Sequence, residues 1–314
     1  MMAIQTREIH MMGTNNQLSV EHDKPQVILD EIIMRLHEFD KRFSTHDPHS
    51  ELMEVNNNAG VKPVKVHPDL YELIKIGKEH SSADDSYLNI AIGPLVQAWQ
   101  ISSSKAHRPT PKTIQTLLSK INARDIILDD QAQTVFLKWT GMFIDLGAIA
   151  KGFIADLIIQ DLEAMNVSAG LINLGGNVMT YGNAPKHEDS FWRIGIQHPF
   201  HVRGTYIAVV KALNQSVVTS GIYERKSIID NQTYHHILDP NTGYPIMTDI
   251  ASLTVVSKKS IDGEIWTSRL FGQPSEQIIN SLEQIKDVEG IVITKNGDLL
   301  YSTGIKPCFN QLVT

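Results

Sequence analysis

Apolar positions in the first half of the chain recur mostly at helical spacing. Between Lys24 and Arg42 they return every three or four residues, at Val27, Ile28, Ile32, Ile33, Leu36 and Phe39. Since this spacing gathers the apolar side chains on one face, it predicts a long amphipathic helix that begins near Pro25. The same reasoning predicts helices over residues 68–81, 112–121 and about 148–165. A strand or hairpin over residues 4–20 precedes them, because a glycine and two asparagines within 13–16 mark a turn.

The second half is richer in short runs of branched and aromatic residues, separated by proline, glycine or Asn/Asp turns. These runs predict strands over 191–197, 205–212, 216–219, 223–229, 233–237 and 250–257, and similar runs occur earlier at 126–128, 134–139 and 171–174. Helices are expected at 261–271 and 274–284, before a hairpin whose Asn296-Gly297 tip favours a type I′ turn. Because strands and helices are partly segregated, we expect an α+β fold with mixed or antiparallel sheets and flanking helices.

The pattern contains no internal repeat, low-complexity tract or clear linker. We therefore expect a single domain over residues 4–314, with a helix-rich N-terminal half and a strand-rich C-terminal half. A chain of 314 residues, 42% of them hydrophobic, is long enough to bury a sizeable core. Its net charge of −7 and the absence of a Lys/Arg stripe argue against a nucleic-acid partner, because phosphate binding needs local positive charge.

The cysteine count and the N-terminal sequence exclude further classes of protein. Cys308 is the only cysteine, which excludes an internal disulfide framework and a cysteine-based zinc site. The chain begins without a basic segment followed by an apolar one, has no lipobox, and contains no apolar run of membrane-spanning length. We expect a cytoplasmic protein with no membrane span.

The stretch from Phe143 to Gly152 has the strongest chemical character. An apolar run with strand character ends at Asp145, Gly147 follows, and the predicted central helix begins at about Ala148 with Lys151 in its first turn. Free backbone N–H groups and the helix dipole favour an anion there, and Lys151 would add a full positive charge. The same residues are also explained if Asp145 merely caps the helix and Lys151 is solvated.

Two other stretches place glycines or hydroxyls after strands. Leu174 to Asn177 contains a pair of glycines that would let a ligand approach the backbone closely, although a plain tight turn explains them equally well. The stretch lacks the three spaced glycines of a dinucleotide-binding fingerprint. Thr219 to Arg225 gathers hydroxyls, a phenol and a guanidinium, which could hold a phosphate or a flavin edge, or simply form a hairpin with an ion pair.

Two more stretches offer acid–base and metal chemistry. His235 and His236 end a predicted strand, so their side chains point to opposite faces and at most one enters a given site. Such a histidine can act as a general acid or base, or be structural. Glu264 and Ser268 lie four residues apart on one face of a predicted helix. Their oxygens suit Mg²⁺, with phosphates and water completing its shell, although an ordinary helix surface would also explain them.

In their residues and in their order along the chain, these motifs together strongly resemble those of the FAD:protein FMN transferase family, also called the ApbE family. The matching stretches extend from about Met12 to Phe271, most of the chain. They are 44–56, 93–99, 145–152, 173–177, 192–196, 219–221 and 236–243. Such a set in this order is far more specific than any single glycine turn.

The resemblance implies an ApbE-like fold with its active site in a cleft between two subregions. It also implies an Mg²⁺-dependent transferase that binds FAD as substrate and splits its pyrophosphate. FMN would then be joined through a phosphoester to a Thr or Ser of a target flavoprotein, with release of AMP. The expected partners are therefore FAD and an acceptor flavoprotein.

The resemblance also implies roles for individual residues. The flavin contacts would be Met12, His46, Tyr87, Leu88, Asn89, Asp145, Lys151 and Leu238. The metal ligands would be Glu264, Ser268 and the backbone carbonyl of Ala148. His236 matches the histidine of the family's His-Ile-x-Asp-Pro motif, and we hypothesise that it helps deprotonate the attacking hydroxyl or orients the phosphoryl group.

This chain departs from the family pattern at two places. The family usually has Asp-x-x-x-Thr on the metal helix, where this chain has Glu264 and Ser268, although both substitutions keep oxygen ligands. Asn89 and Ala91 stand where the family favours Asp and Thr. Two alternatives of the same fold are an FAD-binding protein and an FAD pyrophosphatase that releases FMN and AMP. The chain itself contains no acceptor motif, so self-flavinylation is not expected.

Overall fold

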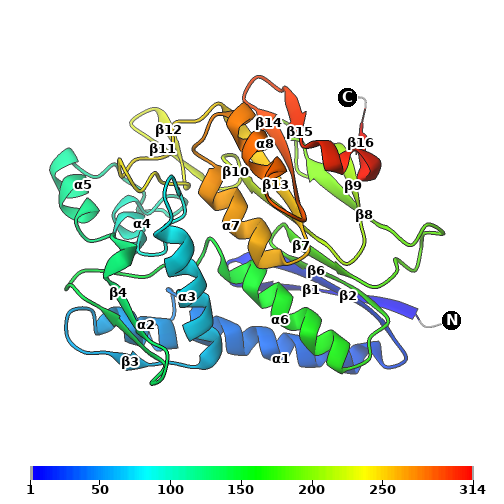
Figure 1. The fold of residues 1–314 in the computed structure, drawn as a ribbon, viewed down its shortest axis with the longest axis horizontal. Helices are drawn as coiled ribbons and strands as arrows, with labels where there is room; N and C mark the ends of the chain where they lie inside the picture. The colour runs from blue at the N-terminus through cyan, green and yellow to red at the C-terminus, as the bar shows by residue number, and fades with distance from the viewer. Residues whose placement is uncertain (1–2, 313–314) are drawn as a thin grey trace.

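The computed structural model describes residues 3–312, and an eight-stranded sheet runs through the middle of the protein (Figure 1). Every neighbouring pair of strands in it is antiparallel. In spatial order the strands are β1 (Ala3–Met11), β2 (Thr14–His22), β6 (Ala169–Leu174), β7 (Asn177–Tyr181), β10 (Ser216–Gly221), β13 (Ile250–Ser257), β14 (Val288–Thr294) and β15 (Leu299–Tyr301).

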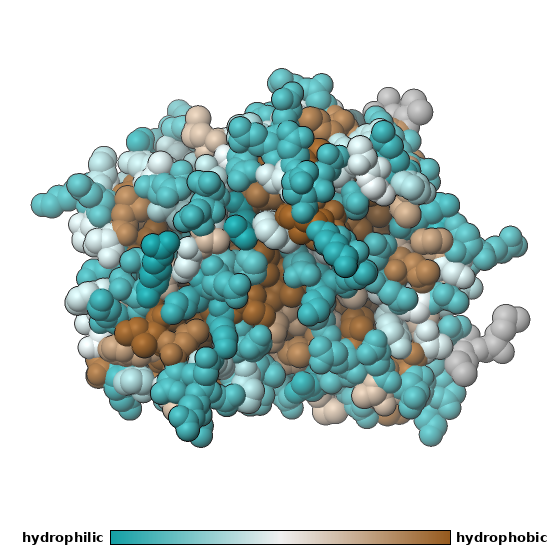
Figure 2. Space-filling view, in the orientation of Figure 1, coloured by the Kyte–Doolittle hydropathy of each residue, from teal (hydrophilic) through white to brown (hydrophobic). Residues whose placement is uncertain are grey.

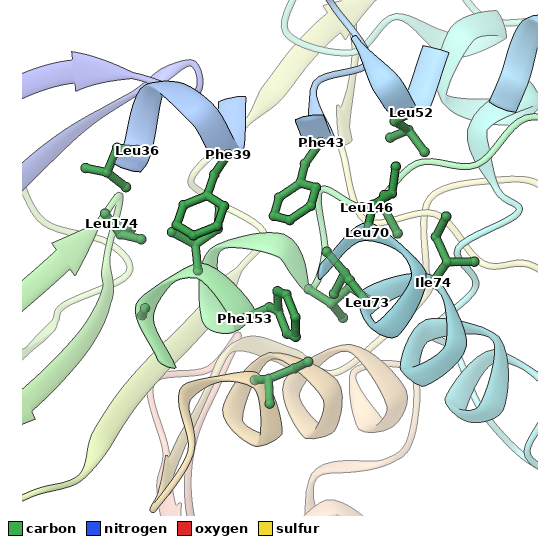
Figure 3. Close-up of a cluster of buried hydrophobic side chains, with 14 of the residues drawn as sticks. Leu36, Phe39, Phe43, Leu52, Leu70, Leu73, Ile74, Leu146, Phe153 and Leu174 are labelled. Carbon is green, nitrogen blue, oxygen red and sulfur yellow. The ribbon is translucent and has the colours of Figure 1, made fainter. Parts of the chain in front are cut away.

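Helices cover one face of this sheet. They are α1 (Pro25–Phe43), α6 (Ala150–Ala164), α7 (Ser260–Leu270) and α8 (Ser275–Glu283). α1 contacts β2 and α6, α7 contacts β10 and β13, and α8 contacts β14. Figure 3 shows the apolar core beneath them, where Phe43 of α1 stacks on Phe39 and meets the edge of Phe153 from α6.

A second sheet of three strands covers the opposite face. It consists of β8 (Trp192–Gln197), β9 (Tyr206–Ala212) and β16 (Phe309–Gln311). Residues of β13 are buried along the whole strand, because Leu253 and Val255 pack toward the α8 side while Val256 packs toward the small sheet. The large sheet therefore has a core on each face.

The remaining elements form a lobe at the left of Figure 1 and a hairpin above it. The lobe contains α2 (Glu51–Asn57), β3 (Val64–Lys65), α3 (Pro68–Ser81), α4 (Gly93–Trp99), α5 (Pro111–Leu118), η1 (Ala123–Asp125), β4 (Ile126–Asp129) and β5 (Thr134–Leu137). The hairpin pairs β11 (Lys226–Ile229) with β12 (Gln232–His235), and η2 (Thr303–Cys308) leads into β16.

The predicted fold class is confirmed: helices flank antiparallel sheets. Most predicted elements are present within a few residues of their expected bounds, and 68–81 and 250–257 agree completely with α3 and β13. The predicted turn type at Asn296-Gly297 is wrong. Gly297 has φ of 92° but Asn296 is not among the described residues with positive φ, so the turn is not the type I′ form, which needs both. Gly297 N–H instead donates to the Thr294 carbonyl at 3.1 Å, which closes a turn with Lys295 and Asn296 at its centre.

Within the described range 3–312, no helix has both the length and the apolar character needed to cross a bilayer.

Candidate active site

The segment before α6 is held by a buried amide rather than by a strand. The Asn56 side chain donates from Nδ2 to the Ile144 carbonyl at 3.0 Å and accepts the Ile144 N–H at 2.7 Å. The Asp145 N–H donates to the Ile90 carbonyl at 2.8 Å. The predicted strand ending at Asp145 is therefore wrong, since Asn56 takes the place of a neighbouring strand and leaves only a bridge between Phe143 and Ile92.

The turn into α6 leaves one carbonyl free. Asp145 Oδ1 accepts the Gly147 N–H at 2.8 Å, and α6 begins at Ala150 rather than Ala148. In a regular helix Gly152 N–H would bond to the carbonyl four residues earlier, at Ala148. It donates instead to Glu264 Oε2 at 2.6 Å. Ala148 is an exposed residue, and its carbonyl accepts no hydrogen bond from the part of the chain that is described.

Glu264 is a buried carboxylate at the junction of α6 and α7. Its side chain is 5% exposed, and its Oε1 lies 3.4 Å from Lys151 Nζ, which also donates to the Gly147 carbonyl at 3.2 Å. Burial raises the pKa of Glu264, while the Lys151 charge and the Gly152 N–H act in the opposite direction. A further cation would relieve the cost of keeping this carboxylate ionised.

Asn177 stands beside Glu264 with an unused donor. Its Oδ1 accepts a hydrogen bond from the Ser260 hydroxyl at 2.6 Å. This bond fixes the orientation of the amide and leaves Nδ2 as the donor on its other side. Nδ2 is buried and makes no hydrogen bond of ordinary geometry with the described residues, although the amide is near enough to Glu264 to lower its pKa. The amide therefore adds positive polarity to the same place as Lys151.

His236 has one ring nitrogen held by the backbone. Its Nδ1 lies 3.1 Å from the Arg225 carbonyl, and because a carbonyl can only accept, Nδ1 carries the proton and Nε2 is an acceptor. The pKa of His236 is lowered to about 4, chiefly by burial and also by the charges of Arg225 and Lys151, while the bond to the Arg225 carbonyl acts in the opposite direction. The imidazole is therefore neutral near pH 7 and lies within the electrostatic reach of Lys151.

The adjacent histidine has a different environment. His235 Nε2 lies 3.1 Å from the Ile246 carbonyl, so that nitrogen is the donor. Burial lowers the pKa of His235 as well. The two rings thus bond to different chain segments, as their alternation along a strand predicts.

Two hairpin turns meet at the end of the sheet next to Asn177. Met12 and Gly13 have φ of 55° and 69°, and Gly175 and Gly176 have φ of 63° and 98°. Both pairs suit type I′ turns, in which glycine avoids the strain that Met12 accepts. A Cβ on Gly175 would lie 2.5 Å from Thr14 Oγ1, so the turns are side by side. Met12 is therefore only one turn away from the strand that begins at Asn177.

Tyr87 lies at the far end of α7. Its N–H donates to the Arg269 carbonyl at 3.1 Å, and its ring occupies the space where a Cβ on Gly272 would be. Burial raises the pKa of Tyr87, and the charges of Asp239 and Asp85 raise it further. Tyr87 thus packs against the end of α7 and lies within electrostatic reach of Asp239, which follows His236 in the chain.

Three other predicted flavin contacts have side chains that are already engaged. Leu88 and Leu238 are 2% and 5% exposed and belong to apolar clusters, so only their backbone groups could reach a ligand. Asn89 donates to the Ile121 carbonyl and accepts the Ala91 N–H, each at 2.8 Å. Leu88 and Asn89 also line a polar cavity of about 470 Å³.

His46 and Ser268 are less constrained. His46 is exposed in the loop before α2, where its N–H donates to Ser44 Oγ at 3.1 Å. Ser268 is half-buried, one helical turn after Glu264. Among the predicted site residues, Lys151 and Glu264 are in direct contact, Ala148 lies close to Lys151 in the chain, and His236 is near enough for the Lys151 charge to lower its pKa. Within the described residues, no direct contact joins His46 or Leu238 to Lys151 or Glu264.

The donor set fits a hard cation. The Ala148 carbonyl is free because Gly152 N–H bonds to Glu264, and the Glu264 carboxylate and Ser268 hydroxyl add oxygen ligands. Mg²⁺ prefers such oxygens and keeps several waters or substrate phosphates in its shell. These three residues could therefore hold Mg²⁺ next to Lys151.

A larger cavity, of about 840 Å³, lies on another side of α6. It is bordered by α3, α6 and the start of α7, and none of the predicted site residues lines it. In the space-filling view, apolar side chains gather near the centre of the face that shows these helices (Figure 2). The cavity of about 840 Å³ is therefore distinct from the group around Lys151.

The sequence interpretation missed three polar residues that shape the site. Asn56 holds Ile144, Asn177 borders Glu264, and Asp156 of α6 accepts the first N–H groups of α7. Asn56 and Asn177 lie within the family-like stretches 44–56 and 173–177, which assign them no role. Asp156 had one available signal, an acid within the largely buried helix 150–164.

Comparison with known proteins gives a consistent result. The sequence pattern of the ApbE family matches residues 12–292. The chain is similar to an FAD:protein FMN transferase of Klebsiella pneumoniae, with 38% identity over 96% of this chain and 93% of the relative. A Treponema pallidum protein of the same name is 31% identical over 94% of this chain and 86% of its own length.

Solved structures support the same fold. The ApbE protein of Thermotoga maritima superimposes with a TM-score of 0.89, covering 98% of this chain and 99% of that one, at 24% identity. The apo flavinyl transferase ApbE of Pseudomonas stutzeri has a TM-score of 0.85 over 99% of this chain and 98% of its own, at 21% identity.

Proposed function

The chain belongs to the ApbE family, and from this premise we propose that it is an FAD:protein FMN transferase. The proposed reaction is Mg²⁺-dependent transfer of FMN from FAD to a Thr or Ser hydroxyl of a target flavoprotein. A bond forms between the acceptor oxygen and the FMN phosphorus, while the bond from that phosphorus to the bridging oxygen breaks. AMP leaves with the bridging oxygen, and the hydroxyl proton is released.

The observation that carries the proposal is the pairing of Lys151 with the buried Glu264 carboxylate at the start of α6, with His236 near enough for the Lys151 charge to lower its pKa. Transfer of a phosphoryl group requires chiefly positioning and neutralisation of charge. Lys151 is 3.4 Å from Glu264 and can move its charge toward a diphosphate. Mg²⁺ held by Glu264, Ser268 and the Ala148 carbonyl would supply the remaining neutralisation.

His236 is suited to receive the hydroxyl proton at Nε2. The bond from Nδ1 to the Arg225 carbonyl fixes the tautomer with Nε2 unprotonated. The lowered pKa, about 4, keeps this nitrogen available over the neutral range, although it also makes the imidazole a weaker base. Orientation by Arg225 therefore matters as much as basicity.

Flavin binding is proposed at the surrounding residues. Met12 at its turn, Tyr87 at the end of α7 and Asp145 before α6 would contribute side chains to this binding. Leu88 and Leu238 would contribute backbone groups, because their side chains are buried. His46 would need to reach the flavin from its exposed loop.

The test is an incubation with FAD, Mg²⁺ and a peptide that carries a threonine in an Asp-Gly-x-Thr-Gly-Ala-Thr-like context. Covalent FMN on the peptide together with AMP is the expected result, and a peptide without threonine should gain no mass. AMP with free FMN would identify an FAD pyrophosphatase. Retained FAD with neither product would identify a binding protein.

A paired variant tests the role of His236. His236→Asn should lower the rate of FMN transfer by about 10²-fold or more, the range of general acid–base catalysis. His37→Asn, on the exposed side of α1, is the matched control and should retain the parent rate. An unchanged rate in the His236 variant would remove this residue from the mechanism.

A further inference from the structure

The start of α7 is capped by a residue of another helix. Lys259, which precedes α7, offers no side-chain cap. Asp156 of α6 takes that role, since its Oδ1 accepts the Ser260 N–H at 2.7 Å and its Oδ2 accepts the Ile261 N–H at 3.0 Å. A carboxylate in this place satisfies two orphan donors and complements the helix dipole.

The start of α6 shows the reverse arrangement. Ile149 provides no side-chain cap for α6, and the Gly152 N–H is instead satisfied by Glu264 of α7 at 2.6 Å. Each helix therefore receives at its N-terminus a carboxylate from the other. These two interactions, called here the exchanged caps, join Asp156 to Ser260 and Ile261, and Glu264 to Gly152.

The exchanged caps leave little freedom between the two helices. A Cβ on Gly152 would lie 2.6 Å from the Ser260 carbonyl oxygen, so the backbones are already in close contact there. The Ser260 hydroxyl also ties the start of α7 to β7 through its 2.6 Å bond to Asn177. Because Glu264 lies one turn beyond this anchored start, its distance from Lys151 and Ala148 depends on where α7 begins.

We propose that Asp156 is a positioning residue for FMN transfer, which holds the Glu264–Ser268 face of α7 in register with Lys151 and the Ala148 carbonyl. This inference rests on the proposed function. Asp156 lines the cavity of about 840 Å³ on another side of α6 and is not part of the group around Lys151, so it acts through α7 alone. A displacement of about 1 Å in such a site can reduce a rate by about 10²-fold.

The protonation of the Asp156 carboxylate can be followed in a test. The pKa of Asp156 is raised to about 6, because burial and the charge of Asp262 outweigh the Ile261 and Ser260 N–H groups and the charge of Lys259, which lower it. Lys258 also borders the cavity that Asp156 lines. Protonation turns one carboxylate oxygen into a donor, which cannot accept an N–H, so one of the two cap bonds is lost below about pH 6.

The experiment compares Asp156→Asn with Asp161→Asn in the full-length protein. Asp161 is the matched control, because it is an acid on the same helix whose partner is Arg35 of α1 rather than α7. The measurements are the kcat and KM for FAD in transfer, and the Mg²⁺ concentration that gives half of the metal-induced thermal shift without FAD. The proposal predicts a kcat at least about tenfold lower and a raised Mg²⁺ half-point for D156N, with the KM changed less. D161N should match the parent in all three.

A pH titration separates positioning from simple stabilisation. In the parent protein the Mg²⁺ half-point should rise more steeply below about pH 6 than it does in D156N, which has no cap carboxylate to protonate. Identical pH profiles in the two proteins would overturn the proposal, as would an unchanged Mg²⁺ half-point in D156N. If D156N does not fold, D156E replaces it: the longer carboxylate should raise the half-point, and a parent value would overturn the proposal.

Failure of the proposed function gives a different result. In that case the parent protein transfers no FMN, yet the Mg²⁺ thermal shift still compares D156N with D161N. A weakened metal response in D156N alone would support positioning by Asp156 without transferase activity. Normal transfer by both variants would contradict the role of Asp156 and leave the transferase proposal intact.

Discussion

Two kinds of helix start can be compared in this protein. α2 and α5 are capped locally, since Ser50 Oγ accepts the Met53 N–H at 3.0 Å and Thr110 Oγ1 accepts the Thr113 N–H at 3.2 Å. α6 and α7 have no local side-chain cap and depend on the exchanged caps. A local cap stabilises one helix, whereas exchanged caps also fix two helices relative to each other. The proposed chemistry takes place beside α6 and α7, the two helices with exchanged caps.

The largest expected effect comes from removing the carboxylate that both caps α6 and faces Lys151. Glu264→Ala should abolish FMN transfer and lower the free energy of unfolding by about 3 kcal/mol, because it leaves Lys151 and the Gly152 N–H without a partner. Urea unfolding and the transfer assay measure the two effects. Glu31→Ala, on the exposed side of α1, serves as control and should change neither.

A smaller effect is expected from closing the gap between the two helices. Gly152→Ala should lower the free energy of unfolding by about 1–3 kcal/mol, since the new Cβ would lie 2.6 Å from the Ser260 carbonyl oxygen. In an unconstrained helix the same substitution would stabilise by about 1 kcal/mol. A gain in stability would therefore show that α6 and α7 are not held together as described.

The local cap offers the contrasting measurement. Ser50→Ala should cost about 1 kcal/mol of stability through the lost bond to the Met53 N–H. FMN transfer per folded molecule should stay within about twofold of the parent. Thermal unfolding and the transfer assay decide this, and a large loss of activity would mean that α2 also positions the site, through Asn56.

The smallest effects concern the pH dependence of stability. The pKa of Asp156 is raised to about 6, so between about pH 4 and 6 the folded state binds more protons and this group makes stability fall as pH rises. The pKa of His236 is lowered to about 4, so this group makes stability rise as pH rises from about 4 to 6.5. Unfolding free energies measured over this window should therefore slope more steeply upward in D156N and less so in H236N. A parallel slope in all three proteins would contradict both assignments.

Local signals in the sequence predicted most elements correctly. Prolines at 25, 68 and 111 each occupy the first turn of a helix, as their fixed φ favours. Glycines at 13, 175 and 176 mark the two turns that meet near Asn177. These features depend on a few neighbouring residues, and that is why periodicity and turn chemistry suffice to find them.

Apart from the turn at Asn296-Gly297, which failed on a local signal, the features that failed or were missed depend on residues far apart in the chain. The segment ending at Asp145 is apolar enough for a strand, but Asn56 supplies its hydrogen bonds from 88 positions away. Asp156 caps a helix that begins 104 residues later, and no local motif encodes that contact. The family resemblance indicated Leu88 and Leu238 but not that their side chains are buried.

The most direct test of the central claim is a structure of the protein with FAD and Mg²⁺ bound. The account predicts that the diphosphate lies within hydrogen-bond distance of Lys151, that the metal contacts Glu264 and the Ala148 carbonyl, and that His236 Nε2 faces the FMN phosphorus. FAD bound in the cavity of about 840 Å³ on another side of α6, with Lys151 still paired to Glu264, would contradict it.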